Sequence, residues 1–540
     1  MPENTPKVIL APAARGMLKD GFDQMARLLA LTLGPTHGIV LSSTALKPAP
    51  EPITGAATTA RRITALPGRG QNAGAMLLRN LVWRVHQRVG DGSATAAVLA
   101  QAMLDQASRY VAAGANPVRV QAGIQQATRR VVAALKDMAS PVACQEQLAS
   151  VAYTATREPD LSFVVGEMFD LLGEHAYVVV ENYMAPYLER EYITGGKWDA
   201  KLISPHLVSS AGTGKAMGRE CNVVLFHGTL SSAEEVLPLI KILSQKEQKN
   251  LLLVAQKISD KALNTLVATF VQNKPKLQFV LVDLVRAGEK ALNDLQDLSL
   301  LTGARLFNPE AGDRLAAIKP ADMGSAQRAE ADAEHLLVSG GKGDPEALRE
   351  QVDALRKYLG GLAFDDNQAE EIKMRLGRLT GNMGIVKVGA HSQNERDVLH
   401  QKAQQGIHAL HAALAAGILP GGGTAYLHCV ALVEKMDCAD EDERLGYRAV
   451  ARALRRPFEQ LLQNAHVPNP GSLMHEILNS APGLVYDTQA KKIRPASEAG
   501  ILDAAQTLIV SIETASSGAQ MALSTDVLVL KRKPKISYEP

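Results

Sequence analysis

The segment GDGSATAAVLAQAM, residues 90–103, joins a glycine-containing loop to a long helical stretch. Apolar residues recur there at a 3.6-residue spacing, which predicts a helix; they are Val98, Leu99, Ala102 and Met103. Gly114 to Pro117, read as GANP, ends the helix. The same alanine-rich, helical texture extends over residues 17–136 and returns over residues 402–525. The two ends of the chain are therefore expected to be helical.

The middle of the chain, from about residue 192 to 384, has a different pattern. The apolar runs NVVLF, LLLVA and FVLVDLV, which begin at Asn222, Leu251 and Phe279, have the length of strands. Helical segments alternate with them, and Ser232 with Glu235 has the spacing of a helix capping box. This alternation predicts a mainly parallel sheet with covering helices. The simplest architecture is an α/β domain inserted into a helical domain.

Composition excludes several classes of protein. The chain has 540 residues, of which 46% are hydrophobic and 21% charged, as in an ordinary globular protein. The formal net charge of +2 gives no basic footprint for nucleic acid or anionic membrane. The four cysteines form no CxxC pair, and no apolar run reaches the roughly 18 residues of a membrane span. We expect a cytoplasmic protein that has neither nucleic acid nor membrane as a partner.

Three glycine-containing elements are candidates for a ligand site. In the loop at Gly90, free N–H groups at a helix start favour phosphate, and Asp91 is suited to hold Mg²⁺ together with phosphate oxygens. The alternative is a plain capped helix whose N-cap is Asp91 or Ser93. Residues 32–35 (TLGP) and 421–423 (GGG) are each compatible with a simple turn. Together the three elements favour a nucleotide pocket.

The helix over residues 232–245 and the one that follows Ser259 carry more apolar residues than one buried stripe needs. Most of these residues are expected to pack against the sheet. The alternative for the remainder is a solvent-facing groove that binds peptide.

These segments and their order resemble the group I, GroEL-type chaperonins along nearly the whole chain. The matching motifs are TLGP from Thr32, GDGSATAAVLAQAM from Gly90, AAGANP from Ala112, VKVGA from Val386, GILPGGGTAYL from Gly417 and GILD from Gly500. The middle of the chain is similar mainly through SSAEEVLPLI and KALNTLV.

The resemblance implies a multidomain, GroEL-like fold. A mainly α-helical equatorial domain would comprise residues 1–137 and 416–540, and a small α+β intermediate domain residues 138–193 and 384–415. An inserted α/β apical domain would comprise residues 194–383. The resemblance also implies a homo-oligomeric ring, or a ring mixed with a paralogue, that takes up non-native protein clients. A co-chaperonin is a possible further partner.

Family roles carry over to individual positions of this sequence. The implied cofactors are ATP and Mg²⁺, with K⁺ as a possible third ligand, and Asp91 would be the metal ligand. The backbone at Gly422 would run alongside the nucleoside, and Asp503 would form a hydrogen bond with the ribose. The implied nucleotide-binding residues are Thr32, Leu33, Gly34, Pro35, Asp91, Gly92, Ser93, Ala94, Thr95, Gly422 and Asp503. The implied client-binding residues are Leu202, Leu207, Leu237, Ile240, Leu263 and Val267.

The sequence departs from the family at the catalytic positions. The aspartate expected sixteen residues before the glycine triplet is Gln405, and the expected lysine and second carboxylate are Gly55 and Ala56. An amide orients water but does not act as a base near neutral pH. We therefore assign no catalytic residue and expect an ATP-linked folding cycle with impaired hydrolysis. The alternative is an ATP-independent holdase or assembly scaffold on the same frame.

Overall fold

The structure is a computed structural model of the whole chain. It describes residues 7–35, 40–44, 47–53, 55–173, 176–193, 195–204, 215–245, 250–272, 278–362 and 367–530. The chain divides into two compact units. Unit 1 comprises Met1–Glu174, Val180–Glu189 and Val386–Pro540, and unit 2 comprises His175–Val179 and Arg190–Ile385. The finer division into three domains stays a prediction.

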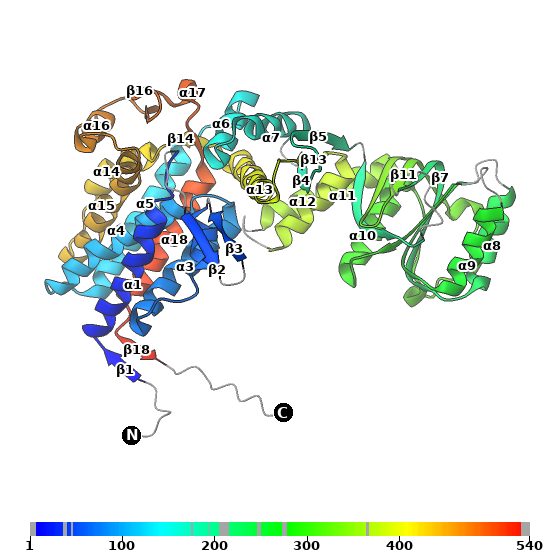
Figure 1. Cartoon of the computed structure of the whole chain (residues 1–540), viewed down its shortest axis with the longest axis horizontal. Helices are drawn as coiled ribbons and strands as arrows, with labels where there is room; N and C mark the ends of the chain where they lie inside the picture. The colour runs from blue at the N-terminus through cyan, green and yellow to red at the C-terminus, as the bar shows by residue number, and fades with distance from the viewer. Residues whose placement is uncertain are drawn as a thin grey trace. The chain divides into compact units, whose positions relative to one another are not determined.

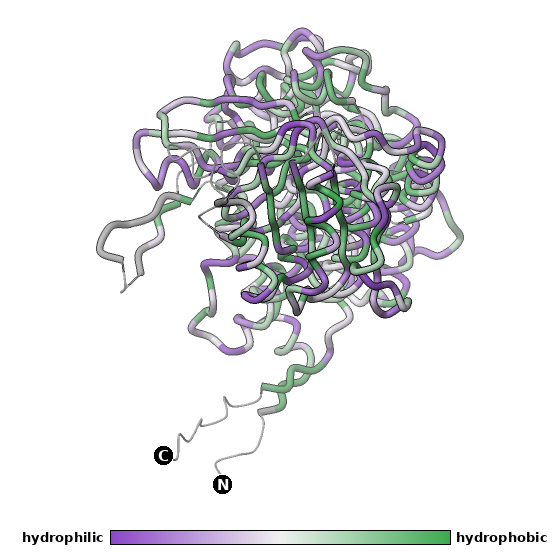
Figure 2. Tube along the Cα trace, turned by 90° about the vertical axis from the view of Figure 1, so that its right-hand side faces the viewer, coloured by the Kyte–Doolittle hydropathy of each residue, from purple (hydrophilic) through white to green (hydrophobic). Residues whose placement is uncertain are grey.

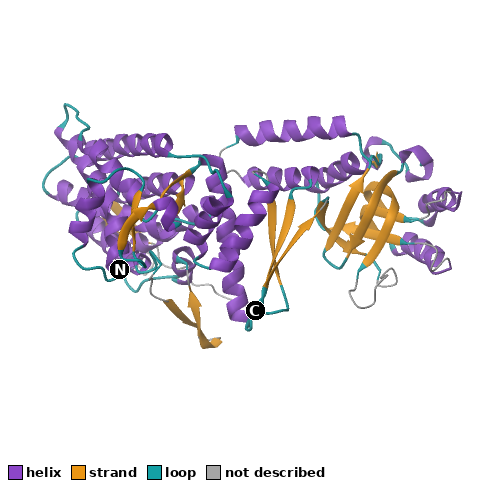
Figure 3. Ribbon diagram, turned by 90° about the horizontal axis from the view of Figure 1, so that it is seen from above, coloured by secondary structure: helices purple, strands orange, loops and turns teal. Residues whose placement is uncertain are grey.

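Unit 1 is dominated by helices, as Figure 3 shows in purple. Its helices are α1 (Ala13–Ala30), α2 (Ala56–Arg62), α3 (Arg69–Val89), α4 (Ser93–Ala112), α5 (Pro117–Met138), α6 (Gln145–Thr156), α7 (Pro159–Leu172), α13 (Gln393–Ala416), α14 (Thr424–Glu434), α15 (Glu441–Asn464), α16 (Pro470–Leu478), α17 (Ala496–Ala499) and α18 (Ala505–Leu523). Its short strands are β1 (Lys7–Leu10), β2 (Val40–Thr44), β3 (Lys47–Ile53), β14 (Ile418–Pro420), β15 (Leu484–Asp487), β16 (Lys492–Pro495), β17 (Leu502–Ala504) and β18 (Val527–Leu530).

Helix α4 lies in the interior of unit 1, where it packs against α1, α15 and α18. Ala97, Leu99 and Met103 are among its fully or almost fully buried residues, which agrees with the predicted apolar periodicity. Helices from the N-terminal and C-terminal parts of the chain therefore share one core. Strands β1 and β18 pair next to the termini, with Lys7 opposite Leu530 (Figure 1).

Glycines let α1 and α3 approach each other at backbone distance. A Cβ atom at Gly21 would lie 1.7 Å from the Gln71 carbonyl oxygen, and one at Gly74 would lie 1.8 Å from the Leu18 carbonyl oxygen. Neither position accommodates a larger residue without separating the two helices.

One segment contradicts the prediction that residues 17–136 are helical throughout. Strands β2 and β3 form an antiparallel pair, with Val40 opposite Ile53. Prolines recur at every second position of β3, which reads KPAPEPI. Proline removes the N–H group that a helix interior needs but is tolerated on an edge strand, and both strands of a two-stranded sheet are edges.

Unit 2 contains a seven-stranded sheet of order β10-β7-β11-β12-β6-β9-β8, in which β7 also pairs with β8. Its strands are β6 (Gly196–Leu202), β7 (Ala216–Leu230), β8 (Leu251–Ile258), β9 (Phe279–Leu284), β10 (Leu306–Phe307), β11 (Gly324–Ala331) and β12 (His335–Gly341). The helices are α8 (Ala233–Gln245), α9 (Asp260–Gln272), α10 (Glu289–Thr302), α11 (Pro345–Gly361), α12 (Asn367–Thr380) and the 3-10 turns η2 (Pro309–Ala311), η3 (Leu315–Ala317) and η4 (Pro320–Asp322).

The sheet is mixed, so the prediction of a mainly parallel sheet is wrong. Strands β7, β8 and β9 do pair in parallel, with α8 and α9 as the connections. Strands β6, β11 and β12 add antiparallel pairs. The β11–β12 connection is a tight turn in which the Asp332 carboxylate accepts hydrogen bonds from the N–H groups of Glu334 and His335. A connection this short forces antiparallel pairing.

The core of unit 2 lies between the sheet and its helices. Val224, Leu253 and Leu281, one from each parallel strand, are buried. Figure 2 shows the sheet strands as largely hydrophobic segments. The predicted cap of α8 is present in part, since the Glu235 carboxylate accepts a hydrogen bond of 3.1 Å from the Ser232 N–H. None of the described helices combines the length and apolarity needed to cross a bilayer.

A three-stranded sheet lies where the chain passes between the units. It has the order β4-β13-β5 and consists of β4 (Tyr177–Asn182), β5 (Leu188–Ile193) and β13 (Met383–Val388).

Candidate functional site

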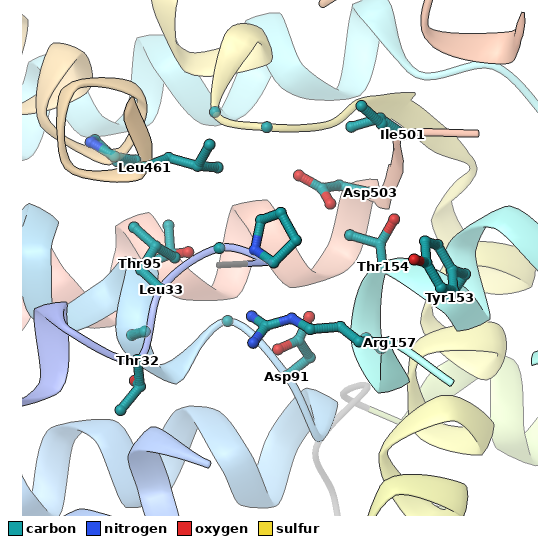
Figure 4. Close-up of a pocket in the computed structure, with 18 of the residues that line it drawn as sticks. Thr32, Leu33, Asp91, Thr95, Tyr153, Thr154, Arg157, Leu461, Ile501 and Asp503 are labelled. Carbon is teal, nitrogen blue, oxygen red and sulfur yellow. The ribbon is translucent and has the colours of Figure 1, made fainter. Parts of the chain in front are cut away.

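A pocket in unit 1 forms where the glycine-containing turns meet the start of α4 (Figure 4). Its lining includes all eleven positions assigned to nucleotide binding from the sequence: Thr32, Leu33, Gly34, Pro35, Asp91, Gly92, Ser93, Ala94, Thr95, Gly422 and Asp503. Segments that are more than 400 residues apart in the sequence therefore contribute to one concave surface.

The start of α4 has the geometry of an anion site. The N-cap is Gly92, whose φ of 81° lies in the left-handed region, and no side chain caps the helix. The alternative that Asp91 or Ser93 caps it is therefore wrong, since the Ser93 hydroxyl instead donates to the Val82 carbonyl at 3.0 Å. Uncapped N–H groups and the helix dipole at this end attract negative charge.

The loop before α4 is seated against helix α18. A Cβ atom at Gly92 would lie 2.4 Å from Ser511 Oγ, and the Ser511 hydroxyl is 3.3 Å from the Gly92 carbonyl oxygen. Only glycine permits both the backbone conformation and this close approach. The loop is therefore held with Asp91 in the pocket wall.

The other two glycine turns close the pocket from α1 and α14. Thr32 follows α1, and its buried hydroxyl donates to the Leu29 carbonyl at 2.7 Å. Gly34 has a φ of 91° and leaves room for Leu461, whose Cγ would be 3.2 Å from a Cβ there. Gly422 also has a positive φ, of 65°, directly before α14. Both turns thus present backbone and small groups to the cavity.

Two buried carboxyl groups, those of Asp91 and Asp503, line the pocket. Burial raises the pKa of Asp91, while the Gly92 N–H and the Arg157 guanidinium act in the opposite direction. Burial, with a smaller effect from Asp91, raises the pKa of Asp503 to about 7. The shift of Asp503 by Asp91 indicates that the two carboxylates repel each other. A cation in the pocket would relieve this repulsion.

Asp91 fits the requirements of a Mg²⁺ ligand. Among the described residues, no group of three or more His, Cys, Asp or Glu side chains is placed to hold a metal. Mg²⁺ commonly takes only one or two protein carboxylates and completes its shell with phosphate oxygens and water. A single carboxylate beside an anion site meets that pattern.

The three positions that depart from the family lie together. Gly55, Ala56 and Gln405 all line the pocket, and a Cβ atom at Gly55 would lie 3.5 Å from Gln405 Nε2. Gly55 has an extended backbone with φ −112° and is the N-cap of α2. The carboxamide of Gln405 thus lies next to Gly55 in the pocket, where the resemblance to GroEL-type chaperonins implies charged groups.

Sequence reasoning missed several lining residues, among them Tyr153, Thr154, Arg157 and Lys402. The first three lie at the end of α6, and Lys402 lies on α13 with its ammonium 2.6 Å from the Glu158 carboxylate. None of these residues belongs to a recognisable motif. Only the packing of α6 against α13 brings them to the site.

The residues assigned to client binding lie in unit 2, and Leu207 falls outside the described residues. Helices α8 and α9 lie side by side. The core alternative holds for Val236, Leu239 and Leu243, which are buried on α8. Leu237 is 51% exposed. The remaining four are partly buried against the core: Leu202, Ile240, Leu263 and Val267.

The model of the TCP-1/cpn60 chaperonin family matches residues 70–182 and 229–533. The chain belongs to this family. This chaperonin is 29% identical to chaperonin GroEL 1 of Polaromonas naphthalenivorans over 535 residues, which is 99% of this chain and 97% of the relative. It is also 29% identical to chaperonin GroEL 2 of Albidiferax ferrireducens over 528 residues, 97% of this chain and 96% of that relative. It is a divergent GroEL-type chaperonin.

A solved structure shares the chaperonin fold. The chaperonin gp146 from bacteriophage EL 2 (Pseudomonas aeruginosa), crystallised in the presence of ATP-BeFx, matches with a TM-score of 0.72 at 18% identity. The match covers 97% of this chain and 99% of that chain. The multidomain, GroEL-like fold predicted from the sequence is thus confirmed. The family match, and not this structural likeness, supports a role as a protein-folding chaperonin.

Proposed function

We propose that this chaperonin binds ATP with Mg²⁺ in the unit 1 pocket and that the nucleotide regulates its binding of non-native protein clients and assists their folding. We further propose that it hydrolyses ATP slowly. The observation that supports this most is the convergence of all eleven candidate nucleotide residues on one pocket. The helix N-terminus at Gly92 would hold phosphate and Asp91 would hold Mg²⁺, which offsets phosphate charge when bound.

The expectation of slow hydrolysis rests on the residue types at three positions. Attack by water on the terminal phosphate needs a group that orients or deprotonates the water, together with cations that stabilise the developing charge. The side chains at the three family positions are the Gln405 carboxamide, the Ala56 methyl and none at Gly55. Loss of a general base typically costs about 10²–10⁴-fold in rate.

The proposal also covers how the subunits assemble and which residues bind clients. By analogy with GroEL-type relatives, the subunits would form a ring, alone or with a paralogue, and the partly exposed apolar residues of α8 and α9 would bind clients. A co-chaperonin is a further expected partner. Gly55, Ala56 and Gln405 are also compatible with the ATP-independent holdase, but the convergence of the candidate nucleotide residues on one pocket supports the ATP-linked cycle.

Steady-state ATP turnover of the purified full-length chain, with Mg²⁺ and K⁺ and free of host chaperonin, tests the proposal. We expect measurable ATP binding with turnover at least about 100-fold below that of an ordinary GroEL-type chaperonin assayed alongside. Ordinary turnover would contradict impaired hydrolysis. Absence of nucleotide binding would contradict the ATP-linked cycle itself.

A further inference from the structure

We propose that Arg157 is the phosphate-binding cation of this pocket, and that it exchanges its contact with Asp91 for nucleotide phosphates when Mg²⁺ binds. The proposal rests on the proposed function, because it assumes that the pocket takes a nucleotide. It assigns a specificity-determining role to a residue for which the sequence carries no motif.

The pocket needs a cation that Gly55 does not supply. Asp91 and Asp503 are the carboxyl groups assigned to this pocket, and the phosphates of a nucleotide would add negative charge. Among the described lining residues, the side chains with a permanent positive charge are Arg157 and Lys402. The Lys402 ammonium is 2.6 Å from the Glu158 carboxylate, so its charge is already balanced. Arg157 also has a carboxylate partner, but that partner is Asp91, the expected Mg²⁺ ligand, so Arg157 is the better candidate.

The Arg157 side chain is directed toward Asp91. Figure 4 shows its guanidinium beside the Asp91 carboxylate, at the loop before α4. Burial lowers the pKa of Arg157, and Asp91 counteracts that effect. Each group thus reduces the cost of burying the other. Asp91 directly precedes Gly92, the N-cap of α4, whose first N–H groups have no side-chain cap and are where phosphates are expected.

The backbone at Arg157 has a conformation that is uncommon for arginine. The residue ends α6 with a φ of 59°, and its N–H donates to the Tyr153 carbonyl at 2.8 Å. Glycine or asparagine suits this left-handed conformation better than arginine does. An arginine at such a turn carries a conformational cost, and residues held in such conformations are found more often at functional sites.

Mg²⁺ binding would change the partner of Arg157. If Asp91 binds Mg²⁺, the metal would balance the carboxylate charge in place of the Arg157 guanidinium. The planar guanidinium can then bind phosphate oxygens through two parallel hydrogen bonds. Arg157 would thereby act from α6 in place of the lysine that is absent at Gly55.

Calorimetric titration of the full-length chain with ATP, ADP and adenosine in Mg²⁺ tests this assignment. For Arg157→Gln we expect Kd to rise about 10- to 100-fold for ATP and ADP, since a hydrogen bond to a charged group is lost. Adenosine affinity should stay within twofold, and Arg157→Lys, which keeps the charge but not the paired hydrogen bonds, should lose less phosphate affinity than Arg157→Gln. The matched control is Arg61→Gln, whose guanidinium lies 4.2 Å from the Trp83 ring centroid and outside this pocket; it should change Kd less than threefold.

The outcomes separate the two proposals. If the unaltered chain binds neither ATP nor ADP, the proposed function fails. If it binds them and Arg157→Gln binds equally well, the Arg157 assignment is overturned while the proposed function stands. Equal loss of adenosine affinity would also overturn it, because the effect would then be structural. Arg157→Asn, which suits the left-handed turn, provides the same measurement if the glutamine variant does not fold.

Discussion

At the residue scale, the proposed impairment of hydrolysis rests on three positions that line the same pocket. Gly55, Ala56 and Gln405 can each be replaced without evident backbone strain, since Gly55 is extended and Ala56 begins α2. An aspartate at the first position of a helix is also favourable to the helix dipole. The pocket therefore offers a direct way to restore the family's charges.

We predict that Gln405→Asp raises ATP turnover and that the triple variant with Gly55→Lys and Ala56→Asp raises it further, by about 100-fold or more in total. The carboxylate supplies a base, and the lysine supplies a cation toward phosphate. Steady-state turnover at saturating ATP measures the effect. Gln404→Asp, one residue away on the exposed side of α13, is the control and should leave turnover unchanged. An inactive triple variant that still binds ATP would contradict this explanation.

The glycine turns of the site were predictable, because each turn is a local motif. Arg157 and Lys402 were not, since their place in the pocket depends on how α6 packs against α13. The parallel strands β7, β8 and β9 were predicted from their apolar runs, but β11 was not, because GSAQRAEA has little β-propensity. Its place comes from its two antiparallel neighbours, a non-local effect.

At the element scale, the contact between α1 and α3 requires glycine. We predict that Gly21→Ala lowers the free energy of unfolding by about 1–3 kcal/mol, because the added methyl would overlap the Gln71 carbonyl. Gly16→Ala in the same helix meets nothing within 4 Å and should raise the free energy of unfolding by about 0.5–1 kcal/mol. Urea denaturation followed by circular dichroism measures both. Similar effects of the two variants would contradict the close approach of α1 and α3.

A buried ion pair links α10 and α12 in unit 2. The Arg375 guanidinium donates to both oxygens of Asp297, at 2.8 Å and 3.0 Å, and Asp297 is fully buried. Burial raises the pKa of Asp297 to about 6, although Arg375 and Arg378 oppose the shift. Asp297 is thus ionised above about pH 6 and then needs its partner.

We predict that Arg375→Ala lowers the free energy of unfolding by about 3–5 kcal/mol at pH 8, because it leaves a buried carboxylate unpaired. The deficit should be smaller at pH 5, where Asp297 is protonated in the folded chain. Arg356→Ala, which removes an exposed pair with Asp353 at 3.4 Å, should cost less than about 1 kcal/mol at either pH. A pH-independent deficit for Arg375→Ala would contradict the role of Asp297 ionisation.

At the scale of the whole molecule, the candidate nucleotide residues and the candidate client residues belong to different units. The chain crosses between the units four times, within or next to the strands of the β4-β13-β5 sheet. An ATP-linked cycle requires that nucleotide bound to unit 1 change the affinity of unit 2 for clients, whereas a holdase requires no such coupling.

Capture of a chemically denatured client, measured as suppression of its aggregation, distinguishes these cases. We predict that Mg²⁺-ATP weakens capture by the unaltered chain and has a smaller effect on Arg157→Gln at the same nucleotide concentration. Leu237→Ser should weaken capture about fivefold without nucleotide, since it removes a half-exposed apolar contact. Val285→Ser, equally exposed in unit 2 but off α8 and α9, is the control and should have no effect. Capture that is unaffected by nucleotide in the unaltered chain would favour the holdase, because the apolar face would then act without the pocket.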